Sequence, residues 1–154
     1  MKRFSYLATF GFSAVLASAQ GFTPAQQHNS SVVGITAGQT AKLNVLYPSV
    51  PAPLLQVMCA VTLNLVDDQG TVLKSQDFLM LGGRSVSVSL NVDTDLGGRS
   101  AQIHALTLTP PTSASGGYCT VLPSLDIVDN ATGKTAVHLE TTITYPGPVA
   151  LRVR

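Results

Sequence analysis

The sequence predicts an all-β protein. We expect an antiparallel two-sheet β-sandwich, immunoglobulin-like in the broad sense, with about eight strands after a cleaved signal peptide. Two observations favour this fold class: apolar residues recur at every second position in several short runs, and turn-forming residues separate these runs. A closed barrel is the alternative, because alternation does not reveal the order of the strands.

Residues 1–19 have the three parts of a secretory signal peptide. Lys2 and Arg3 form a short positive region, an uncharged apolar stretch follows, and small residues precede a cleavage point before Gln20. The apolar stretch is well short of the ~20 residues that a spanning helix needs. We therefore expect export to the periplasm, the cell surface or the extracellular space, with residues 20–31 as a flexible N-terminal segment.

The sandwich domain is expected over residues 32–143, which contain strict and weaker alternating runs. In "RSVSVSLNV", for example, valine and leucine alternate with serine and asparagine, as in a strand with one buried face. The strict runs are 41–47, 59–65 and 86–92. The weaker runs are Val32–Thr36, Thr71–Leu81, Ser100–Thr109, Tyr118–Asp129 and Lys134–Ile143.

Turn-forming segments connect these runs. "DDQG" ending at Gly70 and "DNATG" ending at Gly133 are typical of hairpin connections, in which glycine adopts positive φ at little cost. The proline-rich "YPSVPAPL" cannot lie inside a central strand. Residues 144–154 form a tail in which Val149, Leu151 and Val153 alternate with alanine and arginine. This pattern fits either a last edge strand or a segment that docks onto a partner.

The chain has two cysteines, Cys59 and Cys119. Counting by twos from each leads through apolar residues, so both are expected to face the core. In an exported chain this favours one buried structural disulfide, either across a strand pair or between the sheets. A zinc site needs further ligands, and a catalytic thiol needs a basic neighbour, which neither cysteine has in its strand.

Composition argues against several classes of function. Without Lys2 and Arg3 the chain is close to neutral, so it has no basic surface for nucleic acid. Its 45% apolar content is enough to build a core. There is no tryptophan and little other aromatic material, which disfavours the flat platforms used by sugar-binding surfaces.

The histidines are candidates for catalysis only in combination with other groups. A serine hydrolase would have to bring His104 or His138 together with an aspartate and a serine that are distant in sequence. No Gly-x-Ser-x-Gly elbow is present. The period-two pattern slips near Ala105, which suggests a bulge and leaves the direction of His104 open. His138 alternates with apolar residues and is expected to face solvent, and His28 lies in the flexible segment.

Carboxylate pairs are the remaining candidates. "DTDLGG" from Asp93 resembles the opening of a calcium loop but lacks its downstream glutamate. Two other pairs, Asp67 with Asp68 and Asp126 with Asp129, lie at strand ends, where aspartate usually forms turns. Weak calcium binding is therefore an alternative, and we expect no metal or other cofactor in the leading interpretation.

The order of four segments resembles that of small exported bacterial β-sandwich proteins of unknown function. The segments are "GQTAKLNV", "CAVTLNLVDDQG", "SVSVSL" and "DIVDNATGKTAV". The resemblance implies a fold and an exported location, and it carries no activity to any residue.

The leading expectation is therefore an exported, non-enzymatic interaction or structural module of the cell envelope or extracellular space. An envelope or extracellular protein is the expected partner, bound for example by addition of a strand to an open sheet edge. The alternatives are a secreted hydrolase with a dispersed His/Asp/Ser site and a module that binds calcium or sugar.

Overall fold

A computed structural model describes residues 25–48, 58–111, 119–140 and 142–144 of the 154-residue chain. The predicted signal peptide and most of the predicted tail lie outside these residues. The described part forms strands and one helical turn. In chain order they are β1 (Gln26–Asn29), β2 (Val33–Ile35), β3 (Gln39–Tyr47), β4 (Cys59–Asp67), β5 (Val72–Met80), β6 (Arg84–Asn91), α1 (Val92–Asp95), β7 (Ala101–Thr109), β8 (Leu122–Asp129), β9 (Thr135–Glu140) and β10 (Thr142–Thr144).

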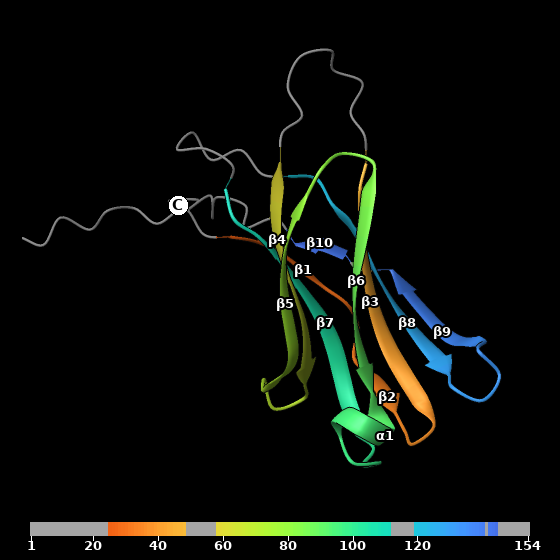
Figure 1. Ribbon diagram of the computed structural model, residues 1–154. Helices are drawn as coiled ribbons and strands as arrows, with labels where there is room; N and C mark the ends of the chain where they lie inside the picture. The colour runs from red at the N-terminus through yellow and green to blue at the C-terminus, as the bar shows by residue number, and fades with distance from the viewer. Residues whose placement is uncertain (1–24, 49–57, 112–118, 141, 145–154) are drawn as a thin grey trace, which may run out of the picture.

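The strands form two antiparallel sheets, so the predicted sandwich is confirmed. One sheet has the order β10-β1-β7-β4-β5, with β2 also paired to β7, and the other has the order β6-β3-β8-β9. Figure 1 shows the two layers facing each other, with α1 at one end. Every predicted run forms a strand. The described strands number more than about eight because the last run divides into β9 and β10 and because β1 was not expected.

The alternation in sequence places the core between the sheets, as predicted. In β3, the side chains of Ala41, Leu43 and Val45 are fully buried, and they face inward from the centre of the four-stranded sheet. The facing strand β4 contributes Leu63 and Leu65, which are also fully buried. Burying one such side chain contributes about 1.5–3 kcal/mol, so these central strands hold the sandwich together.

The hairpin turns have the backbone conformation that their glycines predict. Gly70 and Gly133 have φ values of 83° and 68°, in the left-handed region that only glycine enters freely. They close the β4–β5 and β8–β9 connections. Substituting either glycine would therefore strain its turn.

Two sequence expectations are wrong. Residues 26–29 form β1 instead of part of a flexible segment, because their backbone pairs with β7 on one side and with β10 on the other. The expected bulge at Ala105 is absent from the β7–β4 pairing, which is in continuous register there. On the other side of β7, residues 30–32 stand opposite residues 104 and 105, between the pairs Asn29↔Leu106 and Val33↔Ile103. The bulges of the described strands lie between Leu65 and Val66 and between Ile127 and Val128.

The chain changes sheets beside β9. Glu140 ends β9 in the four-stranded sheet, and Thr142 already begins β10 in the other sheet. β10 then pairs with β1 from Asn29↔Thr142 to Gln27↔Thr144. The described fold therefore extends from the β1 region to Thr144, the first residue of the predicted tail.

Candidate functional site

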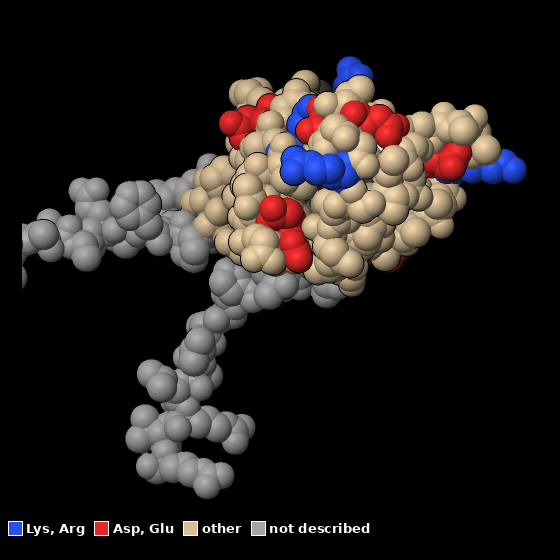
Figure 2. All heavy atoms as spheres, turned by 90° about the horizontal axis from the view of Figure 1, so that it is seen from below, with Lys and Arg blue, Asp and Glu red and all other residues tan. Residues whose placement is uncertain are grey.

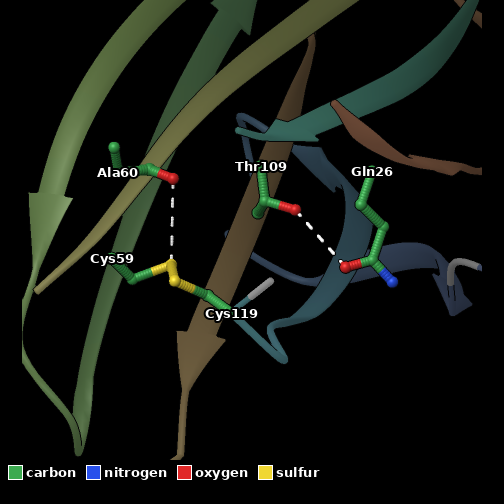
Figure 3. The surroundings of a disulfide bond; sticks show 5 residues. All are labelled: Gln26, Cys59, Ala60, Thr109 and Cys119. Atoms are coloured by element: carbon green, nitrogen blue, oxygen red, sulfur yellow. Dashed lines mark hydrogen bonds between the residues drawn. A yellow bond between two sulfur atoms is a disulfide. The ribbon is translucent and has the colours of Figure 1, made fainter. Parts of the chain in front are cut away.

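The two cysteines form a disulfide that joins the sheets, as Figure 3 shows. Cys59 begins β4 in one sheet, and Cys119 precedes β8 in the other; their Cα atoms are 5.9 Å apart. Both are buried. The dashed line from Cys59 Sγ to Ala60 O in Figure 3 is a sulfur–oxygen contact of 3.8 Å, because a bridged sulfur has no proton to donate. The disulfide is structural, as predicted.

The carboxylates of the "DTDLGG" segment hold the α1 end of the sandwich together. Asp93 accepts a hydrogen bond from the backbone N–H of Gly38 (2.9 Å) and another from the Asn130 side chain (3.4 Å). Asp95 accepts one from the N–H of Asn91 (2.8 Å) and pairs with Lys74 (3.1 Å), so the pKa of Asp95 lies below its ordinary value, chiefly because of the backbone hydrogen bond. Figure 2 looks onto this end and shows acidic and basic side chains interspersed.

The other predicted carboxylate pairs also take part in local structure. Asp67 accepts hydrogen bonds from two N–H groups of its own turn. In the β8–β9 turn, Asp129 accepts hydrogen bonds from the N–H and the hydroxyl of Thr132. Asp126, by contrast, lies within β8 and contacts His138. Among the described residues, no group of three or more His, Cys, Asp or Glu side chains comes together as a metal site would require.

A shallow cleft of about 600 Å³ opens near the α1 end. Its lining includes the apolar side chains of Ile35, Leu73 and Leu96 and the charged side chains of Asp68 and Arg99. The Nε–H of Arg99 donates to the carbonyl of Leu96 (3.3 Å), which directs the side chain back onto its own loop.

His28 is buried, with both ring nitrogens unpartnered. It lies opposite Thr107 in the β1–β7 register, and the Thr107 hydroxyl is also buried without a partner. Burial disfavours the charged imidazolium and therefore lowers the pKa of His28. This burial is not expected from the sequence, in which His28 lies in the predicted flexible segment.

The two histidines considered for catalysis lie on different sheets. His104 is on β7 in the six-stranded sheet, opposite Val66 on the face away from the core. His138 is on β9 in the four-stranded sheet and is 54% exposed, so its predicted direction toward solvent is confirmed. A catalytic site that uses one of these histidines therefore cannot include the other.

His138 is part of a hydrogen-bonded chain on the outer face of the four-stranded sheet. Its Nδ1 lies 2.5 Å from Asp126 Oδ1, and Asn44 Nδ2 donates to Asp126 Oδ2 over 2.7 Å. The hydrogen bond to Asp126 and the charge of Asp126 raise the pKa of His138, and the charge of Glu140 adds to this effect. Three neighbouring strands thus hold one aspartate in a fixed position.

A depression of about 410 Å³ lies beside this chain. Its lining includes Ser124, His138 and Glu140, together with the exposed apolar pair Leu46 and Leu122. The two leucines are directly opposite each other in the β3–β8 register. The Ser124 hydroxyl forms no hydrogen bond with His138 in the described part of the chain, although both line the same depression. This surface combines an apolar patch with a histidine and two carboxylates.

β9 is the open edge of this sheet among the described strands. It pairs only with β8, and its inward side chains Val137 and Leu139 pack on the core but are only half-buried. Glu140 is exposed and forms no ion pair with a described residue. An edge strand with incomplete burial is a template for an added strand.

The other edges differ from β9. β5 carries Lys74 on its inward side, opposite Leu65, and an inward charge discourages pairing with another chain. β6 has two of its three inward apolar residues, Val88 and Leu90, already buried at 3% and 0% exposure, and only Val86 is half-buried. β10 has only three residues. β9 is therefore the described edge that gains most from a partner.

The fold and the disulfide define this chain as a bridged antiparallel β-sandwich. No known family model matches it, and a comparison with curated proteins finds no match. Within the described ranges there is no helix with the length and apolar character needed to cross a bilayer. A disulfide is typical of an oxidising compartment.

Proposed function

We propose that this protein is an exported, non-enzymatic interaction module that binds a partner through β9. The observation that carries the proposal is the one-sided pairing of β9 together with the half-buried Val137 and Leu139. A partner strand would satisfy the free backbone groups of β9 and complete the burial of both side chains.

Export is part of the same proposal. The signal-peptide pattern of residues 1–19 supports it, and so does the disulfide, which persists only outside reducing compartments. An envelope or extracellular protein is therefore the expected class of partner.

The bound partner is expected to be extended, with alternating side chains. Those facing the core side would be apolar, because they would cover Val137 and Leu139. Those on the outer side would lie near Glu140 and the Asp126–His138 pair and are expected to be polar or basic.

The proposal is tested with Val137→Lys, which places an inward charge on β9 as Lys74 does on β5. The matched control is Ala60→Lys, because Ala60 is an exposed residue of β4 in the other sheet. Each tagged, processed chain is used to capture proteins from envelope and culture-fluid fractions of the host, after thermal melting has confirmed that both variants fold.

We expect a stoichiometric partner to be retained by the unaltered chain and by Ala60→Lys, and to be lost with Val137→Lys. Equal retention by all three chains would show that binding does not use β9. Recovery of the chain without any stoichiometric companion, including a second copy of itself, would contradict the proposal as a whole.

A secreted hydrolase is the second candidate, and the hydrogen bond between His138 and Asp126 favours it, because an acid orients the histidine in this way in catalytic triads. Ser124 would be the nucleophile. Hydrolysis of a chromogenic ester that is abolished by both Ser124→Ala and His138→Gln would support this function, and equal background rates for all three chains would contradict it. Binding of calcium or sugar stays a prediction that no contact in the described residues favours.

A further inference from the structure

The β9 edge specifies what kind of strand fits it. Val137 and Leu139 face the core side of the sheet and remain half-buried, so the incoming strand needs apolar side chains at every second position. On the outer side, Glu140 forms no ion pair with a described residue, and the carboxylate of Asp126 lies one strand away. The strand that fits therefore alternates apolar with basic residues.

The chain itself contains such a sequence. In "VALRVR", Val149, Leu151 and Val153 alternate with Ala150, Arg152 and Arg154. This segment is six residues long, as is β9. Resting on the proposed function, we infer that the partner of β9 is a second copy of this chain, which donates residues 149–154 as an added strand.

The charges of donor and acceptor are complementary. With the valines and leucine turned toward Val137 and Leu139, the two arginines lie on the outer face. There they meet Glu140, which also lines the depression on the outer face. Arginine suits this position because it pairs with carboxylates in a planar, bidentate geometry.

The direction of β10 favours a second copy over the same chain as donor. Thr142 lies two residues after the end of β9 and pairs with Asn29. From there β10 runs along β1 until Thr144 pairs with Gln27. Each residue up to Thr144 thus moves further from Glu140 along the edge of the other sheet. Residues from another molecule reach β9 without reversing this path.

Each copy then has one donor and one acceptor. Reciprocal exchange between two copies satisfies both and closes the assembly, so a two-fold symmetric dimer is expected. The dimer is held by main-chain hydrogen bonds along β9, by the newly buried apolar side chains and by the arginine–carboxylate pairs.

The test measures the molar mass of the full, processed chain by light scattering over a concentration series. We expect a monomer–dimer equilibrium that Leu151→Lys weakens at least about tenfold, because a charge replaces a buried side chain. Glu140→Arg and Arg152→Glu should each weaken it by about twofold to fivefold, as expected for exposed ion pairs. The double variant Glu140→Arg/Arg152→Glu should recover most of the loss, and Ala60→Lys, on β4 of the other sheet, should leave the equilibrium unchanged.

Three outcomes would overturn the inference: a monomer at all accessible concentrations, a dimer that Leu151→Lys does not weaken, or a charge-reversed double variant no better than the single ones. Failure of the inference and of the proposed function are distinguishable. If the chain is monomeric while Val137→Lys still loses a different captured protein, β9 binds another partner and only the inference fails. If neither the dimer nor the capture depends on Val137, both fail.

Discussion

At the scale of single residues, the environment of His28 makes the fold sensitive to acid. His28 is buried between β7 and β10 without an acceptor for a ring proton. The inward-facing residues of β7, the strand paired with His28, include no titratable group, so nothing on this strand compensates an imidazolium charge. β1, which carries His28, also provides the described pairing partner of β10.

Burial lowers the pKa of His28 in the folded protein below the unfolded-state value of 6.5. The stability contributed by neutral His28 is therefore complete above pH 6.5 and is lost as pH falls toward the folded-state pKa. We predict that His28→Leu raises the free energy of unfolding, by about 1 kcal/mol at pH 7.5 because two unsatisfied nitrogens are removed, and by more at pH 5. Urea unfolding of both chains across this range measures it. A constant difference between the chains at all pH values would contradict the prediction.

His138 titrates in the opposite sense. The hydrogen bond to Asp126 raises the pKa of His138 above 6.5, so its contribution to stability is complete below 6.5 and is lost as pH rises through the raised pKa. We predict that Asp126→Asn returns the pKa of His138 toward 6.5, as measured by the imidazole resonances in NMR. Asp129→Asn is the control, because Asp129 hydrogen-bonds within its own turn. An unchanged His138 titration in Asp126→Asn would contradict the assignment.

At the scale of elements, one asparagine stabilises the α1 turn. The Asn91 side chain accepts hydrogen bonds from the N–H groups of Asp93 (2.9 Å) and Thr94 (3.3 Å). We predict that Asn91→Ala lowers the free energy of unfolding by about 1 kcal/mol, as for other N-caps. Thr94→Ala should change it by less than about 0.5 kcal/mol, because Thr94 is exposed. Chemical unfolding that shows equal effects for the two variants would contradict the capping role.

The elements also show how far the sequence predicts this molecule. The alternating runs predict β3, β4 and β6 well, because one buried face imposes period two on them. β1 escapes the prediction, since "QQHN" is polar and its strand conformation comes from pairing with β7 and β10. The contact between His138 and Asp126 is unpredictable for a related reason. It depends on the β8–β9 register, which is set by a turn and a bulge that alternation does not reveal.

At the scale of the whole molecule, the disulfide constrains both sheets at once. It closes a loop with a sequence separation of 60 residues between Cys59 and Cys119. Removing it with Cys59→Ala/Cys119→Ala should lower the free energy of unfolding by about 4 kcal/mol on the loop-entropy model. Urea unfolding with and without a reductant measures this. The unaltered chain should lose stability on reduction, whereas the double variant should not respond. Equal stability of the oxidised and reduced unaltered chain would contradict the prediction.

The arrangement of the edge strands also explains why β9 is the strand expected to bind a partner. β5 and β6 form the opposite edges of the sandwich. There an inward Lys74 on β5, or an apolar face on β6 that is buried except at Val86, leaves little for a partner to cover. On the β9 side the chain crosses to the other sheet, and Val137 and Leu139 stay half-buried. The molecule is thus well protected at one side and open at the other.

Amide hydrogen exchange along β9 tests this arrangement most directly. Alternate N–H groups of an antiparallel edge strand point away from its neighbour. In the dilute, unpartnered chain, we predict that amides of Val137–Glu140 exchange much faster than those of the central strand β3, and that they become protected at high protein concentration or when the captured partner is added. Protection of β9 equal to that of β3 in the dilute chain, or no gain when the partner is bound, would contradict the proposal that β9 is the binding edge.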